Sequence, residues 1–456
     1  MNYYSYDIRE HNWIVFHRTS EVDIGSSFWK ELLVLCWKFL LVKKKCFNHK
    51  IKAILGFEKK SVQEKQIIST SLLFIANTIN NERALAPIWR KLEKESYAVI
   101  TLENIDKYYP KELLYQYTLK YIWPLILMYI RSNANDRRVI RNNMDTVMYT
   151  MGFLKITEDI INSSSIKLVV MANDHSPLQR SFQFHASMYG IKTMYVQHAT
   201  VTDKFPPLNF DISVLDGKDS FDKYVQAGPV KGNVFLLGNP RFDSIPLYRE
   251  KKTNEFSIGV AVSRVDDIQV TRLAIMQLIQ DGYSRIIFRP HPNILHDKAW
   301  ISFMDELLSI DIPISNPYNE NPYCFLGKIG ILISGESGLH LDSLLMDVPS
   351  ICYNFSNGRL FDIYGYVAKG WLRYAKTLAD LRCQLDVLSN NNGVGVDIEV
   401  PRYYNTAFGL PVEGETSSVI GDLVRSVVKN ESLNNFNSKY NLSVSSFKGY
   451  NLMAYS

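Results

Sequence analysis

From about residue 70 onward, short apolar runs alternate with longer stretches of helical periodicity. Buried strands are predicted at 70–77 and 98–102, and two long helical patterns follow them. Between residues 166 and 240, four more apolar runs are separated by short helices and loops. Apolar strands that alternate with helices are typical of a parallel sheet covered on both faces. The pattern therefore predicts an α/β domain with helical additions at its N-terminal side.

A second α/β unit is predicted after the charged segment 246–255, which is the best linker candidate in the chain. Its strands are expected at 256–263, 285–290, 329–334 and 350–355, with helices between them. A capped helix is expected near 415–430, and the Asn- and Ser-rich last 25 residues are expected to form a loosely held tail. We therefore expect three parts: a first domain over 1–250, a second over 251–400, and a return helix with tail over 401–456.

The clearest group of polar residues lies in the second unit. Arg289 and His291 follow a strand, and Pro290 and Pro292 restrict the backbone around them. The next candidate strand leads into a helix start whose members are small or polar: Ser334, Gly335, Glu336, Ser337 and Gly338. Free backbone N–H groups and the helix dipole favour an anion there, and a phosphate is the natural occupant. The alternative is a structural histidine beside an ordinary helix start, but two such groups at adjacent strand ends of one sheet favour the phosphate site.

The first unit has a complementary group at the ends of three successive strands. Asp174 and His175 end the first, Gln197 and His198 end the second, and Asp216 ends the third. Carboxylate and imidazole groups at one edge of a sheet are suited to acid/base chemistry on a hydroxyl acceptor. Asp174 could instead be the N-cap of the following helix, and Asp216 could be a turn residue before a glycine. Both alternatives remain open at this point.

Length and composition narrow the class of protein. A chain of 456 residues fits two or three domains, and its 46% apolar and 21% charged residues are ordinary for globular proteins. Five cysteines without a C-x-x-C pair favour neither a disulfide framework nor a zinc site. A net charge of +5 does not indicate a nucleic-acid partner. The N-terminus lacks the features of a secretory signal, so we expect a cytoplasmic protein.

The segment 28–47 is strongly apolar but contains charged residues. Its uninterrupted apolar runs are shorter than the ~20 residues needed to span a bilayer. Its two tryptophans and the Lys43, Lys44 and Lys45 cluster are residue types found at the level of lipid headgroups. The segment is therefore either a buried helix with a basic end or a peripheral membrane contact at the inner face of the cell membrane.

Several enzyme signatures are missing from the chain. It has no P-loop, no G-x-G-x-x-G after a first strand, no G-x-S-x-G elbow and no H-E-x-x-H. It also lacks a D-x-D pair near a strand end, the pattern of a metal–diphosphate site. We therefore expect no metal and no cofactor, and a metal-independent reaction.

Several motifs in order along residues 165–360 resemble GT-B glycosyltransferases of bacterial capsule and O-antigen assembly. The motifs are QHA at 197–199, GNPRFD at 238–243, RPHP at 289–292, the 334–338 helix start leading to Asp342, and the strand from Pro349 to Tyr353. This group of glycosyltransferases includes polysialyltransferases, Kdo transferases and CDP-glycerol glycerophosphotransferases. The resemblance implies two facing Rossmann-like domains, with the donor site mainly in 251–400 and the acceptor site mainly in 1–250.

In relatives of this kind, the His-Pro element binds the donor nucleotide and the serines after the next strand hold its phosphate. Carried over, these roles fall on His291 with Pro292, and on Ser334 and Ser337. The chain departs from the pattern at Glu336, whose carboxylate is awkward beside a phosphate and could instead accept ribose hydroxyls. It also has Ala199 after His198, where glycerophosphotransferases have glycine.

The expected function is transfer of a sugar from a nucleotide-activated donor to a growing bacterial surface polysaccharide. A CMP-activated keto-sugar such as Kdo or sialic acid is favoured by the resemblance, with a UDP-sugar or CDP-glycerol-type donor as the alternative. The acceptor would be lipid-linked or an oligosaccharide. Direct displacement is the simpler course, and a covalent adduct on Asp174 or Asp216 is the alternative. The rival functions are a nucleotide-sugar epimerase or hydrolase and a non-catalytic assembly subunit.

Overall fold

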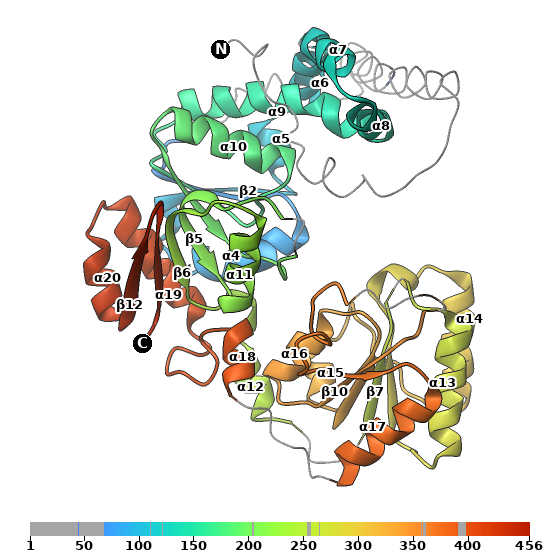
Figure 1. Cartoon of the computed structure of the whole chain (residues 1–456). Coiled ribbons are helices and arrows are strands. Elements are labelled where there is room, and N and C mark those ends of the chain that lie inside the picture. Colours follow the sequence, from blue (N-terminus) through green and yellow to red (C-terminus); the bar gives the residue numbers. More distant parts are fainter. Residues whose placement is uncertain are drawn as a thin grey trace. The chain divides into compact units, whose positions relative to one another are not determined.

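The computed structural model describes residues 44, 68–109, 111–120, 122–202, 205–252, 257–263, 265–356, 358, 362–390 and 398–456. The candidate membrane segment 28–47 therefore lies outside the described residues, apart from Lys44. The chain divides into two compact units, which are described separately (Figure 1). Unit 1 consists of Met1–Asp216, Ser220–Arg241 and Ser417–Ser456, and unit 2 of Gly217–Asp219 and Phe242–Thr416. The division thus assigns 401–416 to the second unit and 417–456 to the first.

Unit 1 is built on an eight-stranded sheet with the order β12-β13-β6-β5-β4-β3-β1-β2. All neighbouring strands are parallel except β12 and β13. The strands are β1 Leu72–Ala76, β2 Tyr97–Thr101, β3 Leu168–Met171, β4 Lys192–Val196, β5 Asn209–Leu215, β6 Lys231–Leu236, β12 Leu442–Phe447 and β13 Tyr450–Tyr455. The central strands are fully buried and rich in aliphatic residues, as expected for a sheet covered on both faces.

Helices cover this sheet and extend beyond it. They are α4 Ile79–Trp89, α5 Ile105–Tyr108, α6 Lys111–Lys120, α7 Ile122–Arg131, α8 Ala134–Asn142, α9 Met144–Asn162, α10 Pro177–Met188, α11 Lys218–Ala227, α19 Thr416–Val428 and α20 Leu433–Lys439. Helix α10 packs on β3 and β4, α9 packs on α10, and α4 packs on β1. Helix α10 begins with Pro177, whose missing N–H is no loss in a first helical turn.

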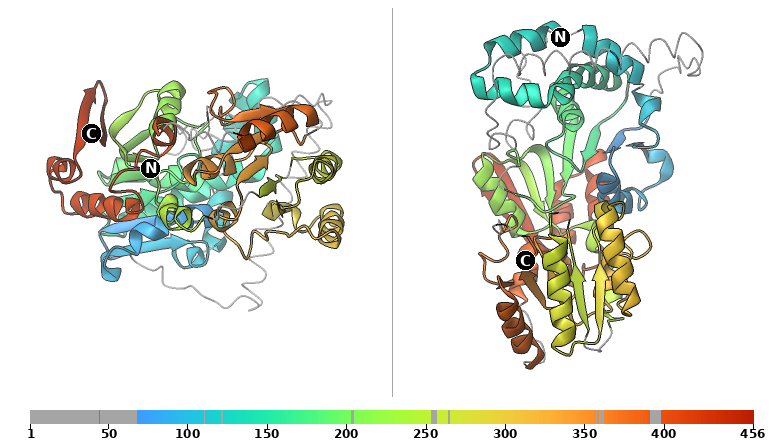
Figure 2. Two further views of the ribbon diagram at one scale, coloured as in Figure 1. Left: turned by 90° about the horizontal axis from the view of Figure 1, so that it is seen from below. Right: turned by 90° about the vertical axis from the view of Figure 1, so that its right-hand side faces the viewer.

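The last residues of the chain complete the sheet of unit 1. Strand β13 pairs in parallel with β6, and β12 pairs antiparallel with β13 at the edge. The dark red hairpin lies at the side of the green strand β6, with β13 next to β6 and β12 at the edge (Figures 1 and 2). A turn at Gly449, with a φ of +100°, joins the two strands. The expectation of a loosely held tail is therefore wrong for these residues, because they make a regular hairpin.

Unit 2 contains a five-stranded parallel sheet with the order β11-β10-β9-β7-β8. Its strands are β7 Ile258–Ala261, β8 Ile286–Arg289, β9 Ile331–Ser334, β10 Ser350–Tyr353 and β11 Arg373–Ala375. Its helices are α12 Ile245–Arg249, α13 Ile268–Gln280, α14 Lys298–Ser309, α15 Pro322–Leu326, α16 Leu339–Leu345, α17 Leu378–Asn390 and α18 Glu399–Tyr404.

Both faces of this second sheet are buried, as β9 illustrates. Ile331 and Ile333 belong to a core cluster with residues of α13, α14 and α17, whereas Leu332 belongs to a cluster with residues of α15 and α16. Successive side chains of a strand point to opposite faces. The prediction of two α/β domains with parallel sheets is confirmed.

Each sheet has a point where the strand order reverses. In unit 1, β1 lies between β2 and β3, and in unit 2, β7 lies between β8 and β9. Ligands of open α/β sheets bind outside the carboxyl ends of the strands at such switch points. The expectation that the strands before His291 and Ser334 are adjacent is wrong, because β7 separates β8 from β9.

No helix among the described residues is long and apolar enough to cross a membrane.

Candidate functional site

Asp174 and His175 follow β3, beside the switch point of the first sheet. The Nδ1 atom of His175 lies 2.7 Å from Oδ1 of Asp174, and Nε2 lies 3.4 Å from Nδ2 of Asn173. A carboxylate only accepts, so Nδ1 carries the proton and Nε2 is the acceptor. Asp174 is 2% exposed, whereas the side chain of His175 is 14% exposed. Of the pair, the imidazole is therefore the group that solvent or a ligand can reach.

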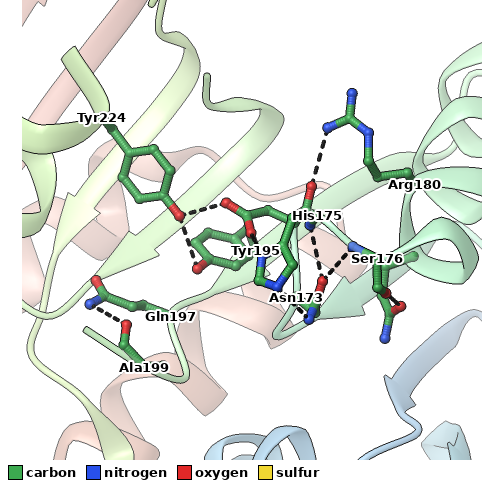
Figure 3. Close-up of polar contacts among 10 residues, drawn as sticks. Asn173, His175, Ser176, Arg180, Tyr195, Gln197, Ala199 and Tyr224 are labelled. Carbon is green, nitrogen blue, oxygen red and sulfur yellow. Dashed lines mark hydrogen bonds and ion pairs between the residues drawn. The ribbon is translucent and has the colours of Figure 1, made fainter. Parts of the chain in front are cut away.

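The alternative reading of Asp174 as a helix cap is wrong. The N-cap of α10 is Ser176, and the amide oxygen of Asn173 accepts hydrogen bonds from the backbone N–H groups of His175 and Ser176, at 3.0 and 2.8 Å. Arg180 donates from Nη1 to the carbonyl oxygen of Asp174 at 3.1 Å (Figure 3). The backbone of this turn is thus held by Asn173 and Arg180, which leaves the carboxylate of Asp174 for other partners.

Two buried tyrosines complete this group and were not singled out from the sequence. Tyr224 of α11 donates from its hydroxyl to Oδ2 of Asp174 at 2.6 Å, and its hydroxyl oxygen lies 3.0 Å from that of Tyr195 on β4 (Figure 3). Burial raises the pKa values of both tyrosines well above the usual value. Both hydroxyls therefore stay protonated across the physiological range.

His198 follows β4 and lies near His175, with a distance of 6.4 Å between the ring centroids. Burial lowers the pKa of His198 to about 4, and neighbouring His175 and Arg241 act in the same direction while Asp174 opposes them. The ring is therefore neutral at physiological pH. Its Nδ1 atom has no hydrogen-bond partner among the described residues. The structure thus brings Asp174, His175 and His198 together, as the sequence predicts for the ends of β3 and β4.

Asp216 follows β5 and is engaged in a second buried network. Its Oδ2 atom accepts from Nε2 of Gln197 at 2.9 Å, and its Oδ1 atom accepts from Nδ2 of Asn239 at 2.8 Å. Its backbone N–H donates to Oε1 of Gln197 at 3.1 Å. Asp216 is 3% exposed. A carboxylate buried with both oxygens bonded is poorly placed to act as a nucleophile, so this geometry indicates a structural role for Asp216.

In unit 2, the loop 334–338 follows β9 at the switch point of the sheet. Ser334 is buried and donates from its hydroxyl to the carbonyl oxygen of Ala261 on β7, at 2.8 Å. The hydroxyl proton is therefore already used inside the sheet. Only oxygen lone pairs remain, and these repel phosphate oxygens, so the geometry does not support Ser334 as a phosphate donor.

Gly335 is contacted by the side chains of Asp266 and His340. A Cβ atom at this position would lie 2.6 Å from Oδ1 of Asp266, so the carboxylate of Asp266 lies directly against the glycine. Nε2 of His340 donates to the carbonyl oxygen of Gly335 at 2.8 Å, and Nδ1 accepts from the hydroxyl of Ser350. Burial lowers the pKa of His340 to about 4. The buried neutral ring thus fixes the path of the loop.

Residues 336–338 differ in which polar groups remain available to bind a ligand. Oε1 of Glu336 accepts from the backbone N–H of Ile363 at 2.6 Å. This carboxylate therefore ties the loop to the 362–368 segment, which is a use different from the ribose contact expected. Oγ of Ser337 accepts from the N–H of Leu339 at 3.1 Å, which leaves its hydroxyl proton free to donate. Gly338 begins α16, with open space where a side chain would be.

Arg289 ends β8, but its guanidinium group is used within the unit. Nη1 donates to Oγ of Ser315 at 2.6 Å and Nη2 donates to the carbonyl oxygen of Glu320 at 3.0 Å. The guanidinium carbon also lies 5.3 Å from the ring centroid of Phe325. These contacts fix the segment after α14, so the geometry indicates a structural role for Arg289.

His291 and Pro292 lie just beyond β8, at the turn η4 Pro292–Ile294. Nδ1 of His291 accepts from the backbone N–H of Asn293 at 3.1 Å, which leaves Nε2 as the other polar atom of the ring. Burial lowers the pKa of the half-buried imidazole. A neutral ring with a protonated Nε2 can donate one hydrogen bond to a ligand oxygen.

Among the described residues, no group of three or more His, Cys, Asp or Glu side chains is arranged to hold a metal ion.

Two Rossmann-like units with candidate groups at their switch points define a GT-B-like architecture. Comparison with solved structures gives the same fold for MnaA of S. aureus in complex with UDP, with a TM-score of 0.50, 13% identity, and coverage of 79% of this chain and 97% of that chain. UDP-GlcNAc 2-epimerase from Methanocaldococcus jannaschii has a TM-score of 0.48, 14% identity, and coverage of 78% and 99%. The wall teichoic acid polymerase TagF has a TM-score of 0.45, 11% identity, and coverage of 86% and 98%.

These similarities concern the fold alone, because the identities are low. Neither a comparison with protein families nor one with curated proteins finds a match.

Proposed function

We propose that the chain is a metal-independent glycosyltransferase, which transfers a sugar from a nucleotide-activated donor to a hydroxyl of a bacterial surface polysaccharide. The observation that carries this proposal is the position of the candidate groups. Asp174 and His175 follow β3 at the switch point of the first sheet, and the 334–338 loop follows β9 at the switch point of the second. These are the places where open α/β sheets bind ligands.

The two groups have complementary chemistry. Unit 1 offers a buried carboxylate with an accessible imidazole, which is an arrangement suited to removing a proton from an acceptor hydroxyl. Unit 2 offers donors: the free hydroxyl proton of Ser337, the Nε2 atom of His291, and backbone N–H groups near Gly338. Such donors stabilise the negative charge that develops on a departing nucleotide phosphate. Direct displacement needs only these two roles.

The identity of the donor nucleotide has support in two directions. The resemblance of the His291 and Pro292 element to CMP-sugar enzymes favours a CMP-activated keto-sugar. MnaA, whose fold is similar, was solved with UDP, and this favours a uridine nucleotide instead. Glu336 does not decide between them, because its carboxylate is bonded to the backbone of Ile363.

A nucleotide-sugar epimerase is the second candidate function. An epimerase moves a proton at a sugar carbon, and the Asp174–His175 pair would serve that step as well as deprotonation of a hydroxyl. The difference between the two functions is the need for an acceptor. A non-catalytic assembly subunit would need neither the pair nor His198.

The deciding experiment incubates the purified protein with a panel of CMP-, CDP- and UDP-sugars, with and without lipid-linked or oligosaccharide acceptors. Transfer only in the presence of acceptor supports the glycosyltransferase. Change of the sugar without acceptor supports the epimerase, and release of free sugar supports a hydrolase. In the active assay, Asp174→Asn should lower the rate at least ~100-fold, the usual span for acid/base groups, and His198→Ala should also lower the rate. Near-normal rates in both variants would contradict the assigned site.

Donor binding is tested separately by thermal-shift titration with CMP, CDP, UMP, UDP and GDP, since a ligand stabilises the state that binds it. Ser337→Ala and His291→Ala should weaken binding of the preferred nucleotide roughly tenfold, as expected for loss of one hydrogen bond to a charged group. Ser315→Ala is the matched control, because its hydroxyl contacts Arg289 rather than the loop. A response to UDP alone would exclude the CMP-sugar donor and leave the transferase class intact.

A further inference from the structure

Four polar side chains form a series of hydrogen bonds from the interior of unit 1 to the end of β3. They are those of Tyr195, Tyr224, Asp174 and His175. The hydroxyl of Tyr224 has a single proton, which is directed to Oδ2 of Asp174 at 2.6 Å. The proton between the two tyrosine hydroxyls, whose oxygens are 3.0 Å apart, is therefore that of Tyr195. Oδ1 of Asp174 in turn holds Nδ1 of His175 at 2.7 Å. Each group thus fixes the next, outward from the core.

We propose that Tyr224, supported by Tyr195, is a positioning residue that holds the carboxylate of Asp174, so that Asp174 keeps His175 in the tautomer with an unprotonated Nε2 atom. His175 is then the catalytic base of the proposed function. The inference rests on that function for the identity of the reaction. The positioning itself is a property of the protein without substrate.

The inner part of this hydrogen-bond series is rigid because both tyrosines are tightly packed as well as hydrogen-bonded. Tyr224 and Tyr195 are fully buried, and their rings meet edge to face with centroids 6.2 Å apart. Phe205 packs edge to face on Tyr224 at 6.2 Å and on His175 at 5.0 Å. A hydroxyl on a packed ring cannot follow a carboxylate that rotates. The carboxylate of Asp174 is therefore held in one orientation by Tyr224.

The hydrogen bond from His175 to Asp174, at the outer end of the series, selects the tautomer of His175. Nδ1–H of His175 points to Asp174, and the amide nitrogen of Asn173 is near Nε2 at 3.4 Å. In the proposed reaction, Nε2 takes the proton of the acceptor hydroxyl and the acceptor oxygen forms the new bond to the anomeric carbon. The bond from that carbon to the nucleotide phosphate breaks, and its electron pair leaves with the phosphate. The imidazolium that results is paired with Asp174, which stabilises its charge.

His198 is the competing base in this part of the sheet. Its neutral ring has no carboxylate bonded to it in the described structure, and its burial disfavours the charged form. His175, in contrast, has a carboxylate bonded to its Nδ1 atom. The geometry therefore favours His175 as the base, with His198 as a neutral ring beside it.

The test compares three Tyr→Phe variants, which remove one hydroxyl each and keep the ring. In Tyr224→Phe, one oxygen of the buried carboxylate loses its donor. We expect kcat to fall tenfold to a hundredfold with little change in nucleotide affinity, of the order seen for groups that orient a catalytic residue. Tyr195→Phe should give a smaller change of the same kind. The matched control is Tyr117→Phe, which removes a tyrosine–carboxylate bond of 3.2 Å to Asp159 elsewhere in unit 1.

The second readout is independent of activity. In protein labelled with ¹⁵N-histidine, the ring nitrogens of His175 report its tautomer, and the His175→Gln variant assigns the signals. We expect the Nδ1–H form in the wild type and in Tyr117→Phe, and a mixture of tautomers in Tyr224→Phe. A wild-type ring protonated on Nε2, or an unchanged tautomer in both Tyr224→Phe and Tyr195→Phe, would overturn the proposal. If the assays show no turnover but the tautomers behave as expected, the positioning stands and only the proposed function fails.

Discussion

The contact between Gly335 and Asp266 gives the sharpest test of the structure of unit 2. A methyl group at residue 335 would lie 2.6 Å from Oδ1 and 3.1 Å from Oδ2 of Asp266. The carboxylate is held by a hydrogen bond from the N–H of Ser263 at 2.6 Å, and the loop is held by the hydrogen bond from His340 to the carbonyl oxygen of Gly335. Neither partner can move away without losing a bond. Gly335→Ala should therefore destabilise the protein by about 1–3 kcal/mol, the range for an overpacked site.

The assay is denaturant unfolding, followed in parallel with nucleotide binding by thermal shift. Gly338→Ala is the matched control three residues further along the loop. Nothing lies within 4 Å of its added methyl group, and its φ of −63° and ψ of −15° are helical. This control should be neutral or stabilising by about 0.4–1 kcal/mol, because alanine restricts the unfolded chain. The same Gly→Ala change should therefore lower the free energy of unfolding at residue 335 but leave it unchanged or raise it at residue 338.

A double-mutant cycle isolates the cause of the effect. In an Asp266→Ala background the obstructing carboxylate is absent, so Gly335→Ala should cost much less than in the wild type. Interacting neighbours typically show coupling energies of about 0.5–3 kcal/mol. Equal costs in the two backgrounds would refute the reasoning, as would a Gly335→Ala variant as stable as Gly338→Ala.

Three further predictions concern buried polar groups. Asn239→Ala removes the donor to Oδ1 of Asp216 and should lower the free energy of unfolding by roughly 1–3 kcal/mol, measured by denaturant unfolding. The pKa of His340 is lowered to about 4, below its usual value near 6.5, so the unfolded state binds a proton that the folded state lacks. The unfolding free energy should therefore fall as the pH decreases from about 6.5 to 4, and less steeply in His340→Gln. Arg289→Lys loses the paired bonds to Ser315 and Glu320, and should lower the melting temperature while nucleotide affinity remains; a large loss of affinity would return Arg289 to the phosphate site.

The positions of the first group of candidate residues could be predicted because β3, β4 and β5 follow one another both in the chain and in the sheet. Their ends meet at one edge, so Asp174 and His198 are neighbours as expected. The same reasoning gave a wrong neighbour in unit 2. There β7 comes between β8 and β9, and a pattern of apolar runs does not encode the order in which strands join a sheet.

Other functional details depend on contacts that no local pattern contains. Tyr195 and Tyr224 have the spacing of ordinary core residues, and only the packing of α11 against β4 shows that the hydroxyl of Tyr224 reaches Asp174 and that of Tyr195 reaches Tyr224. Ser334 and Ser337 look alike in the sequence. The structure separates them, because one hydroxyl donates to the sheet and the other accepts from the helix.

The C-terminal hairpin was missed because its serines and asparagines are typical of loops. One signal was present: the turn at Gly449 lies between Val444 and Leu452, whose apolar side chains alternate with polar ones.

The late arrival of β13 in the sheet of unit 1 has a consequence for how the protein is made. Asn451 of β13 bonds to Asn233 of β6, a partner 218 residues earlier in the chain. During synthesis, β6 therefore emerges from the ribosome as an open strand edge and stays unpaired on that side while unit 2 is translated and folds. Open edges are templates for pairing with other strands. The edge of β6 is therefore open to pairing with other strands until β13 has been synthesised.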